Sequence, residues 1–148
     1  MKNLIEFFLG LILGLSLTLT AYATDYSTIT ITESEYPELI RVIAGESQND
    51  TFEAQIAVVE TIFNRCLDSR FPDTPYTVIS QKGQFSVWKI RYASWIEPSY
   101  GDTALSHVLT QNQSTILNDT AYVLFSTKPQ KYGYDYIKIG KTYFGKLK

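Results

Sequence analysis

Glu46 is the acidic residue with the most favourable position for acid–base chemistry. It directly follows Gly45, a residue type with which helices commonly stop, after an apolar pattern over residues 39–43 that predicts a helix. The C-terminal end of a helix carries partial negative charge, which favours the protonated form of a nearby carboxyl group. A protonated carboxyl can donate its proton to a glycosidic oxygen. From the residues alone, the alternative is an exposed glutamate just past a helix end.

The neighbouring acids have structural interpretations. Asp50 and Glu53 have the spacing of a capping box and predict the start of a second helix at Asp50. Glu60 would lie at the edge of that helix, beside Ile56 and Phe63, and we keep it as a reserve acid. Glu46 is therefore the first candidate for catalysis.

Nucleophilic and metal-dependent chemistry have weaker support. Cys66 and His107 could form a nucleophilic pair, but reactive cysteines favour helix N-termini and Cys66 lies toward the end of the second predicted helix. A serine hydrolase would also need His107 as its base, and the sequence has no Gly-x-Ser-x-Gly segment. One His and one Cys are too few ligands for the usual zinc sites, so we predict no metal and no cofactor.

Aromatic residues cluster after a glycine-containing loop. The loop is Gly83-Gln84-Phe85-Ser86, and the aromatic residues that follow it are Trp88, Tyr92, Trp95 and Tyr100. Aromatic faces can stack on sugar rings, although most such residues pack in the core or at its rim. We expect one or two of them to touch a ligand, with Trp88 and Tyr92 as the candidates.

The first segment of the chain has the features of an export signal. After a basic start, residues 7–19 carry no charge, and the run ends at Ala21-Tyr22-Ala23, a small-x-small cleavage pattern. We predict a signal peptide over 1–23, with an uncleaved membrane anchor as the alternative. The remainder would be secreted or associated with the cell wall, as a loose polar linker over 24–35 and one domain over 36–148.

The remaining patterns predict a mainly helical α+β domain with a small β part toward the C-terminus. Ser34 would cap the first helix, which tolerates Pro37 in its first turn. A third helix would begin near Asp102, and residues 121–125 and 134–144 have the aromatic and β-branched content of short strands. The positions expected to be buried on the second helix are Phe52, Ile56, Val59 and Phe63.

The charge distribution limits the choice of partner. The formal net charge is −2 and the pI is near 5.4, which argues against a nucleic-acid-binding protein. Residues 128–148 contain six Lys and one acid, so this end could face an anionic polymer or could be a solvated tail. We expect a monomer that contacts a membrane only through its N-terminal segment.

The order and spacing of these segments resemble the SleB-type cell-wall hydrolases, the spore cortex-lytic enzyme family. The resemblance covers residues 39–86 well and the remainder loosely. It implies a lysozyme-like, mostly helical fold and action on peptidoglycan. The matching segments are Val42–Ser47, Phe52–Val58, Ile62–Arg65, Phe71–Thr74, Val78–Gln81 and Gly83–Ser86.

The same resemblance implies roles for particular residues. Glu46 occupies the position of the catalytic acid, and Gly83–Ser86 corresponds to a segment that lines the cleft. Gln55, Asn64 and Arg65 match positions that we interpret as mainly structural. Members of the family are typically lytic transglycosylases that break the bond between N-acetylmuramic acid and N-acetylglucosamine. This reaction needs only one acid, whereas most glycoside hydrolases use two.

Two departures from the family pattern leave other functions open. Thr142 stands where the family often has a His, and Phe125–Thr127 replaces a Phe-His-Asn element. These departures put substrate choice and full activity in doubt. The alternatives are a muramidase-type hydrolase and a non-catalytic peptidoglycan-binding module of the same fold.

Overall fold

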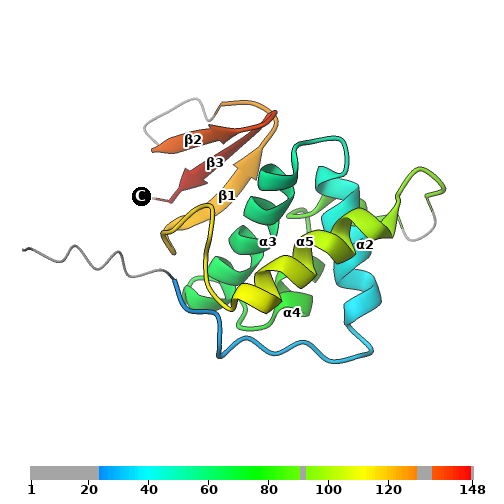
Figure 1. Cartoon of the computed structure of the whole chain (residues 1–148), viewed down its shortest axis with the longest axis horizontal. Coiled ribbons are helices and arrows are strands. Elements are labelled where there is room, and N and C mark those ends of the chain that lie inside the picture. Colours follow the sequence, from blue (N-terminus) through cyan, green and yellow to red (C-terminus); the bar gives the residue numbers. More distant parts are fainter. Residues whose placement is uncertain (1–23, 91–92, 130–134, 148) are drawn as a thin grey trace, which may run out of the picture.

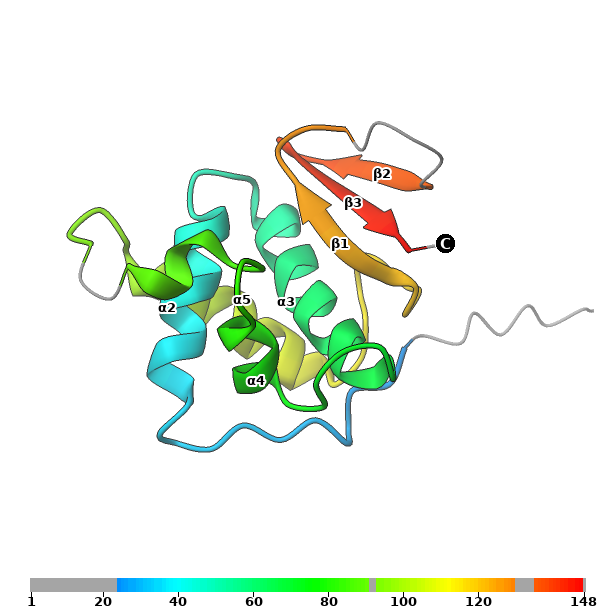
Figure 2. The same ribbon diagram turned by 180° about the vertical axis from the view of Figure 1, so that it is seen from behind.

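A computed structural model describes residues 24–90, 93–129 and 135–147 of the chain. Figures 1 and 2 show a group of helices with a small sheet on one side, next to α3. The mainly helical α+β fold with a small C-terminal sheet is therefore confirmed. In chain order the elements are α2 (Tyr36–Ser47), α3 (Phe52–Leu67), α4 (Pro75–Ser80), the 3-10 helix η1 (Ser86–Lys89), α5 (Pro98–Gln111), β1 (Tyr122–Ser126), β2 (Tyr136–Ile139) and β3 (Thr142–Lys146).

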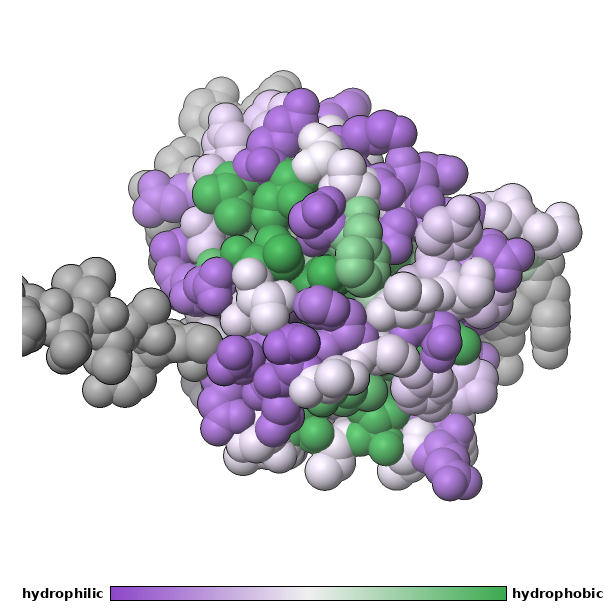
Figure 3. All heavy atoms as spheres, viewed as in Figure 1, coloured by the Kyte–Doolittle hydropathy of each residue, from purple (hydrophilic) through white to green (hydrophobic). Residues whose placement is uncertain are grey.

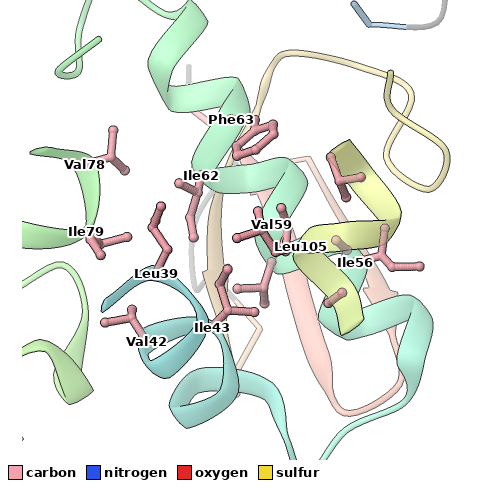
Figure 4. Packing of buried hydrophobic residues seen from close by; sticks show 14 of the residues in the cluster. Leu39, Val42, Ile43, Ile56, Val59, Ile62, Phe63, Val78, Ile79 and Leu105 are labelled. Carbon is pink, nitrogen blue, oxygen red and sulfur yellow. The ribbon is translucent and has the colours of Figure 1, made fainter. Parts of the chain in front are cut away.

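Helix α3 is the centre of the fold. It packs against α2, α4, α5, β1 and β2, and every residue from 54 to 65 is buried. A helix that is buried all round must lie inside the domain and cannot cover only one face of it. Figure 4 shows Ile56, Val59, Ile62 and Phe63 of α3 among the apolar side chains of its neighbours.

The predicted burial pattern of α3 is correct except at its first residue. Ile56, Val59 and Phe63 are between 0% and 3% exposed, whereas Phe52 is 41% exposed. Phe52 lies at the first position of the helix, and one edge of its ring packs on His107 at a centroid distance of 5.7 Å. The helix period alone cannot show that the neighbouring elements end before they cover this position.

The beginnings of α2 and α3 differ from the predictions. Glu35, and not Ser34, is the N-cap residue of α2, and its carboxylate accepts hydrogen bonds from Thr32 N and Oγ1. Thr51, and not Asp50, caps α3 by accepting a hydrogen bond from Ala54 N at 3.3 Å. The third predicted helix begins at Pro98, four residues before the expected start.

The sheet has the strand order β1-β3-β2, with both pairs antiparallel. Phe144 at the centre of β3 pairs with Phe125 of β1 and Ile137 of β2, and it is fully buried. The strand patterns predicted near the C-terminus are therefore correct. In the part of the chain that the structure describes, none of the helices combines the length and the apolar character needed to cross a membrane. The predicted signal segment 1–23 lies outside that part.

Residues 24–35 are not the loose connector that their polarity predicted. Tyr26 is 2% exposed, and its hydroxyl donates a hydrogen bond to Asn64 Oδ1 at 2.8 Å. Its backbone N–H donates to Asn112 O at 3.0 Å, and Ser114 N donates to Thr24 O at 2.8 Å. Burial, and after it the charge of Glu60, raises the pKa of Tyr26, so its hydroxyl stays a donor at neutral pH.

Glu60 is neither a helix-edge charge nor an available acid. Its side chain is 0% exposed and accepts hydrogen bonds from four consecutive residues. Ser114 Oγ and Leu117 N donate to Oε2 at 2.7 Å, while Thr115 N and Ile116 N donate to Oε1 at 2.6 and 3.1 Å. Thr115 Oγ1 also donates to Oε1 at 3.3 Å. The carboxylate therefore binds the loop after α5 to the central helix.

We predict that Glu60→Gln destabilises the domain by about 3 kcal/mol. Both carboxylate oxygens accept hydrogen bonds, so the amide nitrogen would face donors in either orientation and leave buried N–H groups unpaired. Urea denaturation at neutral pH measures the change. Glu53→Gln is the control, because this exposed helix-start glutamate should contribute less than about 1 kcal/mol. Equal effects of the two substitutions would contradict the structural role of Glu60.

Candidate active site

Glu46 lies in the last turn of α2 and not beyond the helix, because α2 continues through Gly45 to Ser47. Its side chain is half-buried, and one of its oxygens is fixed. Ser86 Oγ and Val87 N donate hydrogen bonds to Oε1 at 3.1 and 3.3 Å. Among the described residues, no donor reaches Oε2. The carboxyl group is thus held by one oxygen and available to a ligand through the other.

Gly45 has a steric role in place of the predicted helix-ending one. A Cβ atom at this position would lie 2.8 Å from Val87 Cγ1 and 3.0 Å from Val87 Cβ, closer than side chains can pack. The missing side chain lets η1 approach α2. The same approach places Val87 N and Ser86 Oγ beside the Glu46 carboxylate. The Gly-Glu pair therefore positions the acid through close packing.

Two neighbouring cavities meet at Glu46. They share Glu46, Thr127 and Thr142, so together they form one cleft across the end of α2. The larger cavity, of about 340 Å³, is also lined by Gly83, Gln84, Ser86, Phe125 and Ser126. The smaller cavity, of about 120 Å³, is also lined by Gly45, Ser47, Gln48, Asn49, Asp50 and Lys141.

Three residues of the predicted glycine loop line the larger cavity with Glu46, namely Gly83, Gln84 and Ser86. Phe85 does not, although the resemblance places it in the segment that lines the cleft. It is 3% exposed, its ring lies 5.7 Å from that of Phe125, and the guanidinium of Arg65 lies 5.3 Å above it. Phe85 therefore anchors the loop to the core and leaves its neighbours at the cleft.

Of the two aromatic residues that we expected to contact substrate, Trp88 is not brought to this cleft. Trp88 is half-buried and packs edge-on against Tyr76, with the ring centroids 5.5 Å apart. It lines neither of the two cavities. Tyr92 lies outside the described residues.

Asp50 is a cleft residue that the sequence reasoning missed. It accepts hydrogen bonds from Lys141 N, Thr142 Oγ1 and Thr51 N, each at 2.8 Å. Burial alone would raise the pKa of Asp50, but these donors hold it below its usual range, so the group is ionised at neutral pH. A Cβ atom at Gly140 would meet the Asp50 carboxylate, so the turn between β2 and β3 fits closely around it. Thr51, next to Asp50, is an equally good N-cap residue. Its presence in the sequence could have indicated that Asp50 is not needed as the cap of α3.

Both departures from the SleB-type pattern lie at the cleft. Thr142 is 6% exposed and lines both cavities, and its hydroxyl donates a hydrogen bond to Asp50. Phe125, Ser126 and Thr127, which replace the Phe-His-Asn element, line the larger cavity. At these positions the cleft is lined by the hydroxyl residues Ser126 and Thr142, where the family pattern would place imidazoles.

The alternative nucleophile Cys66 is inert in this structure. Burial, and after it the charge of Asp73, raises the pKa of the Cys66 thiol to about 12, and the thiol donates to Ile62 O at 3.3 Å. His107 packs on Phe52 and lies 3.5 Å from Thr115 Oγ1. In residues 24–90, 93–129 and 135–147, no three His, Cys, Asp or Glu side chains are grouped so that they could hold a metal ion.

Comparisons with known proteins bear on the family and the fold. A family model described as Cell Wall Hydrolase matches residues 49–144. No match is found among curated proteins. The catalytic domain of the germination-specific lytic transglycosylase SleB from Bacillus anthracis is similar in structure, with a TM-score of 0.64 and 20% identity over 78% of this chain and 97% of that chain. The catalytic domain of the Bacillus cereus SleB protein gives a TM-score of 0.65 and 20% identity over 79% of this chain and 93% of that chain.

We predict that Gly45→Ala destabilises the domain by about 1–2 kcal/mol, because the new methyl group overlaps Val87. In a Val87→Ala background both Cγ atoms are gone and only the 3.0 Å contact with Cβ remains, so the same substitution should destabilise the domain by clearly less, below about 1 kcal/mol. A double-mutant cycle from urea unfolding midpoints measures the coupling. Equal effects of Gly45→Ala in the two backgrounds would show that the glycine is not required by the contact with Val87.

Proposed function

The chain belongs to the cell wall hydrolase family, and on that premise we propose that it cleaves the glycan strands of peptidoglycan with Glu46 as its acid–base residue. The observation that carries the proposal is the position of Glu46 at the junction of two cavities, with one oxygen fixed and the other free of donors among the described residues. The family match begins at residue 49, so the role of Glu46 rests on this geometry and on the Gly-Glu segment before the matched region.

The proposed reaction is lytic transglycosylation between N-acetylmuramic acid and N-acetylglucosamine. With Oε1 occupied as an acceptor, the acidic proton of Glu46 would lie on Oε2, from which it passes to the glycosidic oxygen as the bond to the anomeric carbon breaks. The resulting carboxylate then takes the proton of the muramic acid C6 hydroxyl. That hydroxyl oxygen bonds to the anomeric carbon of its own ring and forms a 1,6-anhydro sugar. The intramolecular attack gains from proximity and consumes no water.

The surroundings of the other acids support a single-acid reaction. Glycoside hydrolases generally use a second carboxylate as base or nucleophile. Glu60 is fully buried and occupied by the loop after α5. Asp50 is the other carboxylate that lines the cleft, and three groups already donate to it. Activation of water by Asp50 would give the alternative, a muramidase-type hydrolysis.

Digestion of purified peptidoglycan, with mass spectrometry of the products, tests both the activity and its mechanism. We expect muropeptides with anhydro ends, and we expect Glu46→Gln to lower the rate by at least about 10²-fold while binding to peptidoglycan is retained. Glu53→Gln, a change of an exposed glutamate, should cleave normally.

Two results would change the proposal. Products that carry an added water would replace transglycosylation with a muramidase reaction. A wild-type protein that binds peptidoglycan and never cleaves it would support the non-catalytic module, a function favoured by Thr142 and Ser126, which stand at the cleft in place of the histidines of the family pattern.

We also propose that residues 1–23 are a signal peptide that is removed on export, so that the domain acts outside the cytoplasm. The fold is compatible with cleavage after Ala23, because Thr24 O already accepts a hydrogen bond from the domain at Ser114 N. Expression of the full chain in a bacterium, followed by N-terminal sequencing of the exported protein, should give Thr24 as the first residue. A membrane-bound product with its original N-terminus would favour the anchor.

A further inference from the structure

A third cavity adjoins the cleft at Asp50, between the first turns of α3 and α5. It has a volume of about 420 Å³ and is lined by Asp50, Phe52, Gln55, Ser99, Tyr100 and Thr103. Asp50 also lines the smaller cavity that contains Glu46, so the two spaces are neighbours across this carboxylate. We propose that this third cavity is a distal subsite that holds one sugar ring of the glycan strand. This inference rests on the proposed function and extends it.

Two exposed aromatic rings of the third cavity have the character of sugar-stacking platforms. Phe52 is 41% exposed and Tyr100 is 47% exposed, although apolar rings are normally buried or packed at a rim. The ring of Phe52 is held edge-on against His107 at 5.7 Å, so its orientation is set before a ligand arrives. A preformed aromatic contact binds with a smaller entropic cost than a mobile one.

The polar lining of the third cavity also fits a sugar. Gln55 is 5% exposed, and its Nε2 donates to Asp50 O at 3.2 Å. No donor reaches Gln55 Oε1 from any residue that the structure describes. This carbonyl oxygen can accept a hydrogen bond from an O–H or N–H group of a ligand. The hydroxyls of Ser99 and Thr103 donate within their own segment and keep their oxygens available as acceptors.

The aromatic rings and the hydrogen-bond acceptors that line the third cavity together match an N-acetylated sugar. Its ring C–H groups form apolar faces for Phe52 and Tyr100, while its hydroxyl and amide N–H groups are donors for Gln55 and Thr103. A strand that crosses Glu46 and continues past Asp50 would place such a ring in the third cavity. The reacting bond would then be positioned partly by a contact with a sugar ring outside the cleft that contains Glu46.

The test uses the full chain and peptide-free glycan strands of defined length, four and eight sugars long. Phe52→Ala and Tyr100→Ala should each lower kcat/KM on the eight-sugar strand by about tenfold, chiefly through KM, and should lower it less on the four-sugar strand. Phe52→Trp should restore most of the loss. Tyr136→Ala is the matched control, because Tyr136 is 45% exposed on β2 and lines none of the three cavities.

A binding measurement separates failure of this inference from failure of the proposed function. Calorimetric titration of the Glu46→Gln protein with the eight-sugar strand should give a dissociation constant that rises about tenfold when Phe52→Ala is added. If the wild type cleaves normally and the Phe52 and Tyr100 variants match Tyr136→Ala on both strands, the distal subsite is wrong. If the wild type cleaves no strand but Phe52→Ala still raises the dissociation constant, the subsite is supported and the proposed reaction is wrong.

Discussion

The fold depends on a central helix that is buried on all sides and must therefore satisfy its polar side chains within the protein. Three of these side chains bind segments outside α3. Glu60 holds the loop after α5, Asn64 donates to Asp119 O and Tyr122 O, and Arg65 Nε donates to Val123 O at 2.7 Å. Tyr26 donates to Asn64 from the N-terminal segment. Because these partners are far apart in sequence, α3 determines where the rest of the chain can lie.

The cleft follows from these attachments. Asn64 and Arg65 bind the start of β1, and the end of this strand brings Ser126 and Thr127 to the larger cavity. On the other side, Asp50 binds Lys141 N and Thr142 Oγ1 at the turn between β2 and β3. Glu46 lies between the two on the last turn of α2. An acid on a helix is held more precisely than one on a free loop, which the proposed proton transfer requires.

The sequence was most informative where function and fold depend on local patterns. The Gly-Glu segment pointed to Glu46, the acid–base residue that we propose, and the apolar period of α3 predicted the burial of Ile56, Val59 and Phe63. It was least informative where a polar side chain has a distant partner. The five hydrogen bonds to Glu60 come from residues more than fifty positions later, so no local pattern could distinguish this buried carboxylate from a surface charge.

The errors at Gly45 and Phe52 have a common physical origin. A glycine near a helix end usually provides backbone freedom, and an apolar residue in phase with a buried stripe usually joins the core. Here Gly45 lies inside α2, where the Val87 side chain occupies the position that a Cβ atom would take. Phe52 is exposed because a cavity lies beside it. In both cases a local rule fails beside a cavity that we propose to bind the glycan strand. Such failures are expected at functional sites, where binding a partner outweighs local stability, and both of these border the cavities assigned to the glycan strand.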